Sequence, residues 1–287
     1  FYYKEVAMIT IGLTNWKGHE SLLVDKNKEL ENYTAHFPFV EMDTSFYSIQ
    51  PETNIVNWMG KTPDGFQFIP KAFQAMTTHR EWGDYFPSEK AMFQAFIASF
   101  TPMLEANRIK AFLFQFPPYF ACTKENVDYL RKIRYWMGEL PVAIEFRNNS
   151  WFSENHYGAT LKFLTELQFI QTTVDQPQTQ TNSIPMVLNV TNPSLTLLRL
   201  HGRNFTGWLE SSSPDWRKKR TLYNYSPTEI KELKGYVETL ALDAKEVAVI
   251  FNNNSGGHAA PNAKALQKEL DLSFENLAPQ QLGLDLF

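Results

Sequence analysis

AFLFQFPPYFACTKENVDYLRKIRYWMGELPVAIEF, residues 111–146, is the stretch that decides the fold. Its two ends, AFLFQF (111–116) and VAIEF (142–146), have the length and the aromatic and branched content of buried strands. The segment 124–138 between them looks helical. A strand, a helix and a second strand in this order are typical of a parallel sheet covered by helices.

The same alternation extends in both directions along the chain. Further strand-like runs are MITIGL (8–13), FVEMD (39–43), FQFIPK (66–71), FIQTTVD (169–175), LTLLRL (195–200) and VAVIFN (247–252). Helix-like segments follow most of them, at 87–107, 153–167, 227–242 and 260–270. Eight strand-like runs favour one closed (β/α)8 TIM barrel over 8–275, with a C-terminal tail at 276–287. An open doubly wound sheet is the alternative, but no GxGxxG turn follows the first run.

Two segments have no helical period, 176–193 after the sixth run and 202–226 after the seventh. We expect both to be long loops at the C-terminal face of the barrel, where this fold places its binding loops.

Composition excludes several classes of function. Lys and Arg number 27 against 31 Asp and Glu, so the net charge of −4 argues against a dedicated nucleic-acid or membrane-surface binder. A single cysteine, Cys122, excludes an internal disulfide and fits a reducing compartment. The chain shows neither a long apolar span nor a signal peptide, so we expect a cytoplasmic protein. No feature of the sequence predicts the oligomeric state.

Strand alternation predicts where the polar residues gather. If the large apolar side chains of each run face the helices, the polar side chains near each run's end point into the barrel mouth. These residues are Glu41, Asp43, Lys71, Gln115, Glu145, Arg147, Thr173, Asp175, Arg199, His201, Asn252 and Asn254. Burying such charges unpaired costs several kcal/mol each, so they must pair with one another or bind a ligand.

Glu145 and His201 are the candidates for proton transfer. A carboxylate in apolar surroundings can have its pKa raised into a useful range, and an inward histidine flanked by Arg199 and Arg203 can act as acid or base. The plainer alternatives are a salt bridge from Glu145 to Arg147 or Arg199 and a structural histidine bonded to a carboxylate.

The other polar residues are candidates for binding the substrate. They are Glu41, Lys71, Gln115, Arg147, Asp175, Arg199, Arg203, Asn252 and Asn254. For Lys71, an ion pair with Glu41 is favoured over a Schiff base. Gly256 and Gly257 precede a predicted helix and are expected to bind an anion, or else to form a tight turn.

Metal binding is an alternative that the charges disfavour. Glu41, Glu145, Asp175 and His201 form an oxygen-rich donor set for a divalent metal. Lys71, Arg147 and Arg199 already neutralise these carboxylates, and no HxxxH or HExxH spacing occurs, so we predict no cofactor.

Several motifs together point to a family. They are GLTNW (12–16), VEMDTSFY (40–47), QFPPYF (115–120), EFRNNSWF (145–152), VDQP (174–177), LRLHGRN (198–204) and FNNNSGGHAAPNA (251–263). In this order the chain resembles the YecE/YunF-like family from Gly12 to about Leu266. The resemblance implies a TIM barrel related in shape to the xylose-isomerase-like barrels, in a family of unknown function.

The sequence thus predicts an enzyme, a hydrolase, isomerase or lyase, that uses acid–base chemistry on a small anionic or polyhydroxylated substrate. A sugar or a sugar phosphate would fit. The alternative is a non-catalytic binding module, for instance for single-stranded nucleic acid through RKKR at 217–220. In a chain of net charge −4 we interpret that run as a solvated loop and nucleic acid as the less favoured partner.

Overall fold

The strands close into a barrel. The computed structural model describes residues 6–180, 182–210 and 214–280, and these form an eight-stranded parallel sheet of order β3-β2-β1-β8-β7-β6-β5-β4. Bridges from Phe68 to Ile109 and from Lys71 to Leu113 join β3 to β4. The strands are β1 (Met8–Thr14), β2 (Phe39–Met42), β3 (Gln67–Pro70), β4 (Phe112–Gln115), β5 (Val142–Glu145), β6 (Ile170–Asp175), β7 (Thr196–Leu200) and β8 (Glu246–Phe251). The predicted (β/α)8 barrel is confirmed.

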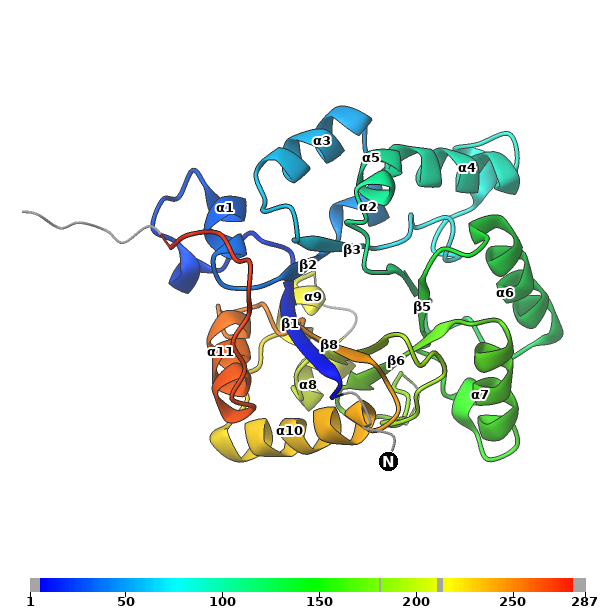
Figure 1. Cartoon of the computed structure of the whole chain (residues 1–287). Coiled ribbons are helices and arrows are strands. Elements are labelled where there is room, and N and C mark those ends of the chain that lie inside the picture. The colour runs from blue at the N-terminus through cyan, green and yellow to red at the C-terminus, as the bar shows by residue number, and fades with distance from the viewer. Residues whose placement is uncertain (1–5, 181, 211–213, 281–287) are drawn as a thin grey trace, which may run out of the picture.

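Most helices surround the strands, whereas α8 and α9 lie inside the ring of outer helices in the view of Figure 1. The α-helices are α1 (Glu29–Thr34), α2 (Thr44–Tyr47), α3 (Glu52–Gly60), α4 (Glu89–Ser99), α5 (Thr101–Glu105), α6 (Lys124–Met137), α7 (Tyr157–Glu166), α8 (Phe205–Leu209), α9 (Trp216–Arg220), α10 (Pro227–Ala241) and α11 (Ala259–Glu269). Short 3-10 helices are η1 (Glu20–Leu22), η2 (Trp82–Asp84) and η3 (Asn149–Phe152). In α10, Ser226 and Glu229 form a capping box and Pro227 opens the first turn, which fixes where the helix begins.

The alternation of side chains divides the core into two layers. The inner layer fills the barrel and consists of Phe39, Ile69, Ala111, Leu113, Ala143, Ile170, Leu195, Leu197, Ala248 and Ile250. Gln115 pairs in register with Glu145, two residues beyond the inner-layer pair Leu113 and Ala143, so both polar side chains share the interior face. The predicted inward direction of these residues is confirmed.

Strand β6 differs from the prediction. Thr173 and Asp175 pair in register with Leu198 and Leu200, whose side chains face outward, so the expected inward direction of Thr173 and Asp175 is wrong. The physical reason is the segment after β6, which covers this outer face without a helix and offers polar partners. The Thr173 hydroxyl donates to the carbonyl of Val187 at 2.6 Å.

The chain beyond α11 turns back along α1, where the Ala278 N–H donates to the Thr34 carbonyl at 3.0 Å. Of the predicted tail at 276–287, residues 281–287 lie outside the described part, as do residue 181 and residues 211–213 of the two predicted loops. Among the helices of the described ranges, none is both long and apolar enough to cross a membrane.

Candidate functional site

A buried ion cluster forms the floor of the barrel mouth. Arg199 on β7 donates from Nε and Nη2 to the two carboxylate oxygens of Glu41, at 2.8 and 2.7 Å. Its third nitrogen, Nη1, donates to Oε2 of Glu145. The three side chains are at most 1% exposed. Arg199 and Glu41 are therefore bonded to the protein itself and do not reach the solvent.

Both carboxylate oxygens of Glu145 are likewise bonded to other side chains. Its Oε1 accepts from Nε2 of Gln115 at 2.8 Å and lies 3.0 Å from Nε2 of His201. Burial alone would raise the pKa of Glu145, but Arg199 and His201 together hold it well below its usual value. The raised pKa expected from the sequence is therefore wrong, because the surroundings of this carboxylate are cationic and not apolar.

His201 is buried between two polar partners. Burial lowers its pKa to about 4 against the opposing effect of Glu145, so the ring is neutral at pH 7. Nε2 then carries the proton and donates to Glu145, and Nδ1 accepts from the Asn252 side-chain amide at 2.8 Å. The sequence-predicted proton-transfer pair thus lies in direct contact, with both ring nitrogens bonded to protein groups.

A cleft of about 770 Å³ opens above this floor. It brings together six of the predicted residues, namely Lys71, Gln115, Arg147, His201, Asn252 and Asn254. Asp43, predicted to point into the mouth, also lines it, together with groups absent from the prediction, among them His79, Trp208, Arg217, Lys218 and Arg220. Burial is the main cause that lowers the pKa of His79 to about 4, and the neighbouring cations Arg147, Lys71 and Arg217 lower it further.

Asp43 and Lys71 form an ion pair at the edge of the cleft. Nζ of Lys71 lies 3.4 Å from Oδ1 of Asp43, at the ends of the neighbouring strands β2 and β3. The other carboxylate oxygen of Asp43 accepts from the Asn15 amide at 3.4 Å. The expected pairing of Lys71 with Glu41 is wrong, because Arg199 already occupies both oxygens of Glu41.

Helix α9 consists of the run WRKKR. Arg220 at its end is 8% exposed, with its guanidinium carbon 3.7 Å from the centre of the Trp208 ring. The interpretation of residues 217–220 as a solvated loop is therefore wrong for Arg220. Arg217 and Arg220 are three residues apart and therefore share one face of the helix. The tryptophan beside this basic run, Trp216, is the feature of the sequence that could have indicated a packed segment.

Asp175 and Arg203 lie outside the cleft and bond to each other. Nε of Arg203 donates to Oδ2 of Asp175 at 2.9 Å, and the Tyr225 hydroxyl donates to the same oxygen at 2.7 Å. Nη1 of Arg203 donates to Glu232 at 2.7 Å. This network attaches the loop after β7 to the outer face of the barrel.

Gly256 and Gly257 do not line the cleft, although the adjacent Ser255 does, and their φ angles are +73° and +75°. Such angles favour glycine, and the pair makes the turn from β8 towards α11. Of the donor set considered as an alternative metal site, Glu41, Glu145 and His201 belong to the ion cluster, and Asp175 bonds to Arg203 outside the cleft. Arg199 lies between Glu41 and Glu145, and within the described ranges no three His, Cys, Asp or Glu side chains are placed to hold a metal ion.

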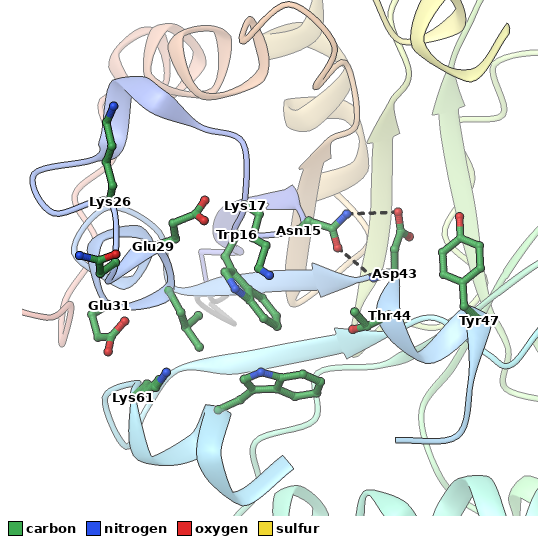
Figure 2. Close-up of a pocket in the computed structure, with 13 residues that line it drawn as sticks. Asn15, Trp16, Lys17, Lys26, Glu29, Glu31, Asp43, Thr44, Tyr47 and Lys61 are labelled. Atoms are coloured by element: carbon green, nitrogen blue, oxygen red, sulfur yellow. Dashed lines mark hydrogen bonds between the residues drawn. The ribbon is translucent and has the colours of Figure 1, made fainter. Parts of the chain in front are cut away.

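A second cavity of about 580 Å³ adjoins the cleft and shares Lys17, Asp43 and Tyr47 with it. Figure 2 shows Asn15 bonded to Asp43 at the boundary between the two. Trp16 and Trp58 line the second cavity, with ring centroids 5.3 Å apart in an edge-to-face arrangement. The mouth therefore extends sideways into a space with an aromatic wall.

Comparison with known proteins gives matches along the whole barrel. Residues 10–283 match a family model described as "Protein of unknown function DUF72". Over 281 residues the chain is 46% identical to the UPF0759 protein YunF of Bacillus subtilis (strain 168), covering 96% of this chain and 100% of that protein. A crystal structure of a DUF72 family protein from Enterococcus faecalis V583 matches at 47% identity with a TM-score of 0.91, covering 96% of this chain and 100% of that one. Another from Thermotoga maritima MSB8 matches at 30% identity with a TM-score of 0.78, covering 92% and 100%.

Proposed function

Because the chain belongs to the DUF72 family, which is described as one of unknown function, we propose its function from the cleft alone. The cleft is the active site of an enzyme that performs acid–base chemistry on a small anionic or polyhydroxylated substrate, such as a sugar or a sugar phosphate. This face of a (β/α)8 barrel hosts the active site in characterised enzymes of the fold.

The pair of Asp43 and Lys71 carries the proposal. Oδ1 of Asp43 is buried without a hydrogen-bond partner, 3.4 Å from the Lys71 ammonium, and both residues line the cleft. A carboxylate oxygen with free lone pairs can accept a proton from the substrate. A neighbouring ammonium can donate one or neutralise the negative charge that develops. We therefore assign proton transfer to Asp43 and Lys71.

Glu145 and His201 are assigned a positioning role in this scheme. Each is bonded to other side chains at every polar atom of its carboxylate or ring. They hold Gln115 and Asn252, whose side chains line the cleft, in fixed orientations. Fixed hydrogen-bond groups of this kind orient a substrate before reaction.

The experiment is a turnover screen of the purified protein with sugars and sugar phosphates in D₂O, followed by ¹H NMR. Exchange of a carbon-bound proton, or new product signals, would report isomerisation, elimination or hydrolysis. We expect Asp43→Asn and Lys71→Met each to lower the rate about 10²–10⁴-fold, the usual contribution of a positioned acid or base. Asp128→Asn, on the exposed side of α6, is the matched control and should leave the rate unchanged.

Turnover that persists in Asp43→Asn would contradict the assignment. Binding of a ligand without turnover in any mixture would instead favour the second candidate function, a non-catalytic binding module. The basic residues Arg217 and Lys218 in the cleft lining favour single-stranded nucleic acid as the ligand of such a module.

A further inference from the structure

Two guanidinium groups in the cleft make no hydrogen bond to a carboxylate of the described residues. Arg147 follows β5, and its buried Nε has no hydrogen-bond partner. The Glu145 oxygen nearest to it is 3.9 Å away and already accepts from Gln115. Arg220 has buried Nε and Nη2 atoms without a partner, and no carboxylate in the described ranges forms an ion pair with it.

Arg220 is held in place although it forms no ion pair with a described carboxylate. Its guanidinium packs on the ring of Trp208, and the Trp208 indole N–H donates to the Asn182 carbonyl at 2.9 Å. Helices α8 and α9 meet closely at Gly207, where a Cβ atom would lie 2.4 Å from the carbonyl oxygen of Lys219. The arginine is therefore preorganised towards the cleft, and ordering it would add little to the cost of binding a ligand.

The charges around the two arginines specify the ligand. Six cations line the cleft, Lys17, Lys71, Arg147, Arg217, Lys218 and Arg220, against Asp43 as the carboxylate among its described lining residues. A buried guanidinium without an anion is costly, so a ligand that supplies the anion gains the full interaction. Arginine forks match phosphate oxygens in a bidentate manner, and two forks suit a dianion.

We propose that Arg147 and Arg220 bind the phosphate group of a phosphomonoester substrate. The inference rests on the proposed function, because it narrows the substrate of the same cleft to the phosphorylated class. It also moves the anion site away from Gly256 and Gly257, which lie outside the cleft lining. The hydroxyls of Thr221 and Ser255, 2.7 Å apart at the cleft wall, are further hydrogen-bond groups for the phosphate.

The test is calorimetric titration with inorganic phosphate and with ribose 5-phosphate, using ribose as the neutral comparison. We expect both phosphates to bind the wild type. Arg147→Met and Arg220→Met should each weaken that binding about 10- to 100-fold, the usual effect of losing a charged hydrogen bond. Arg131→Met, on the exposed face of α6, is the matched control and should bind as the wild type does.

Thermal denaturation without ligand separates a binding role from a structural one. Because Arg220 has no ion-pair partner among the described residues, Arg220→Met, whose side chain can still pack on Trp208, should keep or raise the melting temperature while it loses phosphate binding. A large fall in melting temperature would show that the arginine serves the fold and would overturn the proposal. Arg220→Lys keeps the charge without the fork and should bind phosphate with intermediate affinity.

Three binding results would also overturn the phosphate site. The first is the absence of phosphate binding by the wild type, and the second is binding that both methionine variants retain. The third result is a single-stranded oligonucleotide that binds far more tightly than ribose 5-phosphate, with a salt dependence that Arg217→Met reduces.

The inference and the proposed function can fail separately. If a neutral sugar is turned over in an Asp43-dependent manner while phosphates do not bind, this inference fails and the proposed function stands.

Discussion

Replacing Arg199 with methionine is expected to lower the free energy of unfolding by about 3–5 kcal/mol, the usual result of breaking a buried ion cluster. The substitution leaves Glu41 and Glu145 fully buried without the cation that bonds to both. Urea denaturation monitored by circular dichroism at neutral pH measures the change.

The triple variant Glu41→Gln, Glu145→Gln, Arg199→Met is the informative companion. It removes all three charges, so it should recover a large part of the stability lost in Arg199→Met alone. Arg131→Met on the surface should change stability by no more than about 0.5 kcal/mol. A loss of less than about 1 kcal/mol in Arg199→Met would mean that the cluster is not held together as described.

Acidification is expected to destabilise the protein through His201. The pKa of this histidine is about 4 in the folded protein because of burial, against 6.5 in the unfolded chain. Between these values the unfolded chain binds a proton that the folded protein does not, so the free energy of unfolding falls as the pH falls. The histidine accounts for a loss of about 2 kcal/mol between pH 7 and pH 5.

Other groups titrate in the same region, so the contribution of His201 is isolated by comparison. His79, whose pKa burial also lowers to about 4, acts in the same direction. Burial raises the pKa of Glu41, which acts in the opposite direction. His201→Gln should therefore lose about 2 kcal/mol less than the wild type between pH 7 and pH 5 in urea denaturation. His156→Gln, at an exposed position, should follow the wild type, and equal pH dependence in all three proteins would refute the prediction.

Strand alternation made much of the mouth predictable. In β2, β4, β5 and β7 the large apolar residues leave one face for the polar ones, and Glu41, Gln115, Glu145 and Arg199 point inward as predicted. Strand β6 has polar residues at three of the positions on its outer face, Gln171, Thr173 and Asp175, because its cover is a loop with polar groups. A prediction that takes the apolar residues of a strand to face the helices therefore exchanges the inner and outer faces of such a strand.

The salt bridge between Glu145 and Arg199 was one of the alternatives that the sequence offered, but the other charge pairs could not be predicted in the same way. Lys71 bonds to Asp43 and not to Glu41, and Arg203 bonds to Asp175 outside the cleft. Each of these ion pairs depends on the distance between a basic side chain and a carboxylate on a neighbouring strand or loop. Those distances are set only when the barrel closes.

The sequence by itself determined the barrel, its order of elements and the end at which its polar residues gather, because strand and helix periods are local properties of the chain. The tertiary structure alone decided which of the polar residues bond to one another and which are left to bind a ligand. It packs Glu41, Glu145, Arg199 and His201 into a mutually bonded floor and brings Arg220 of α9 into the cleft, more than seventy positions along the chain from Arg147. Whether a buried charge binds the protein or a ligand depends on its neighbours in space, and those neighbours come from distant parts of the sequence.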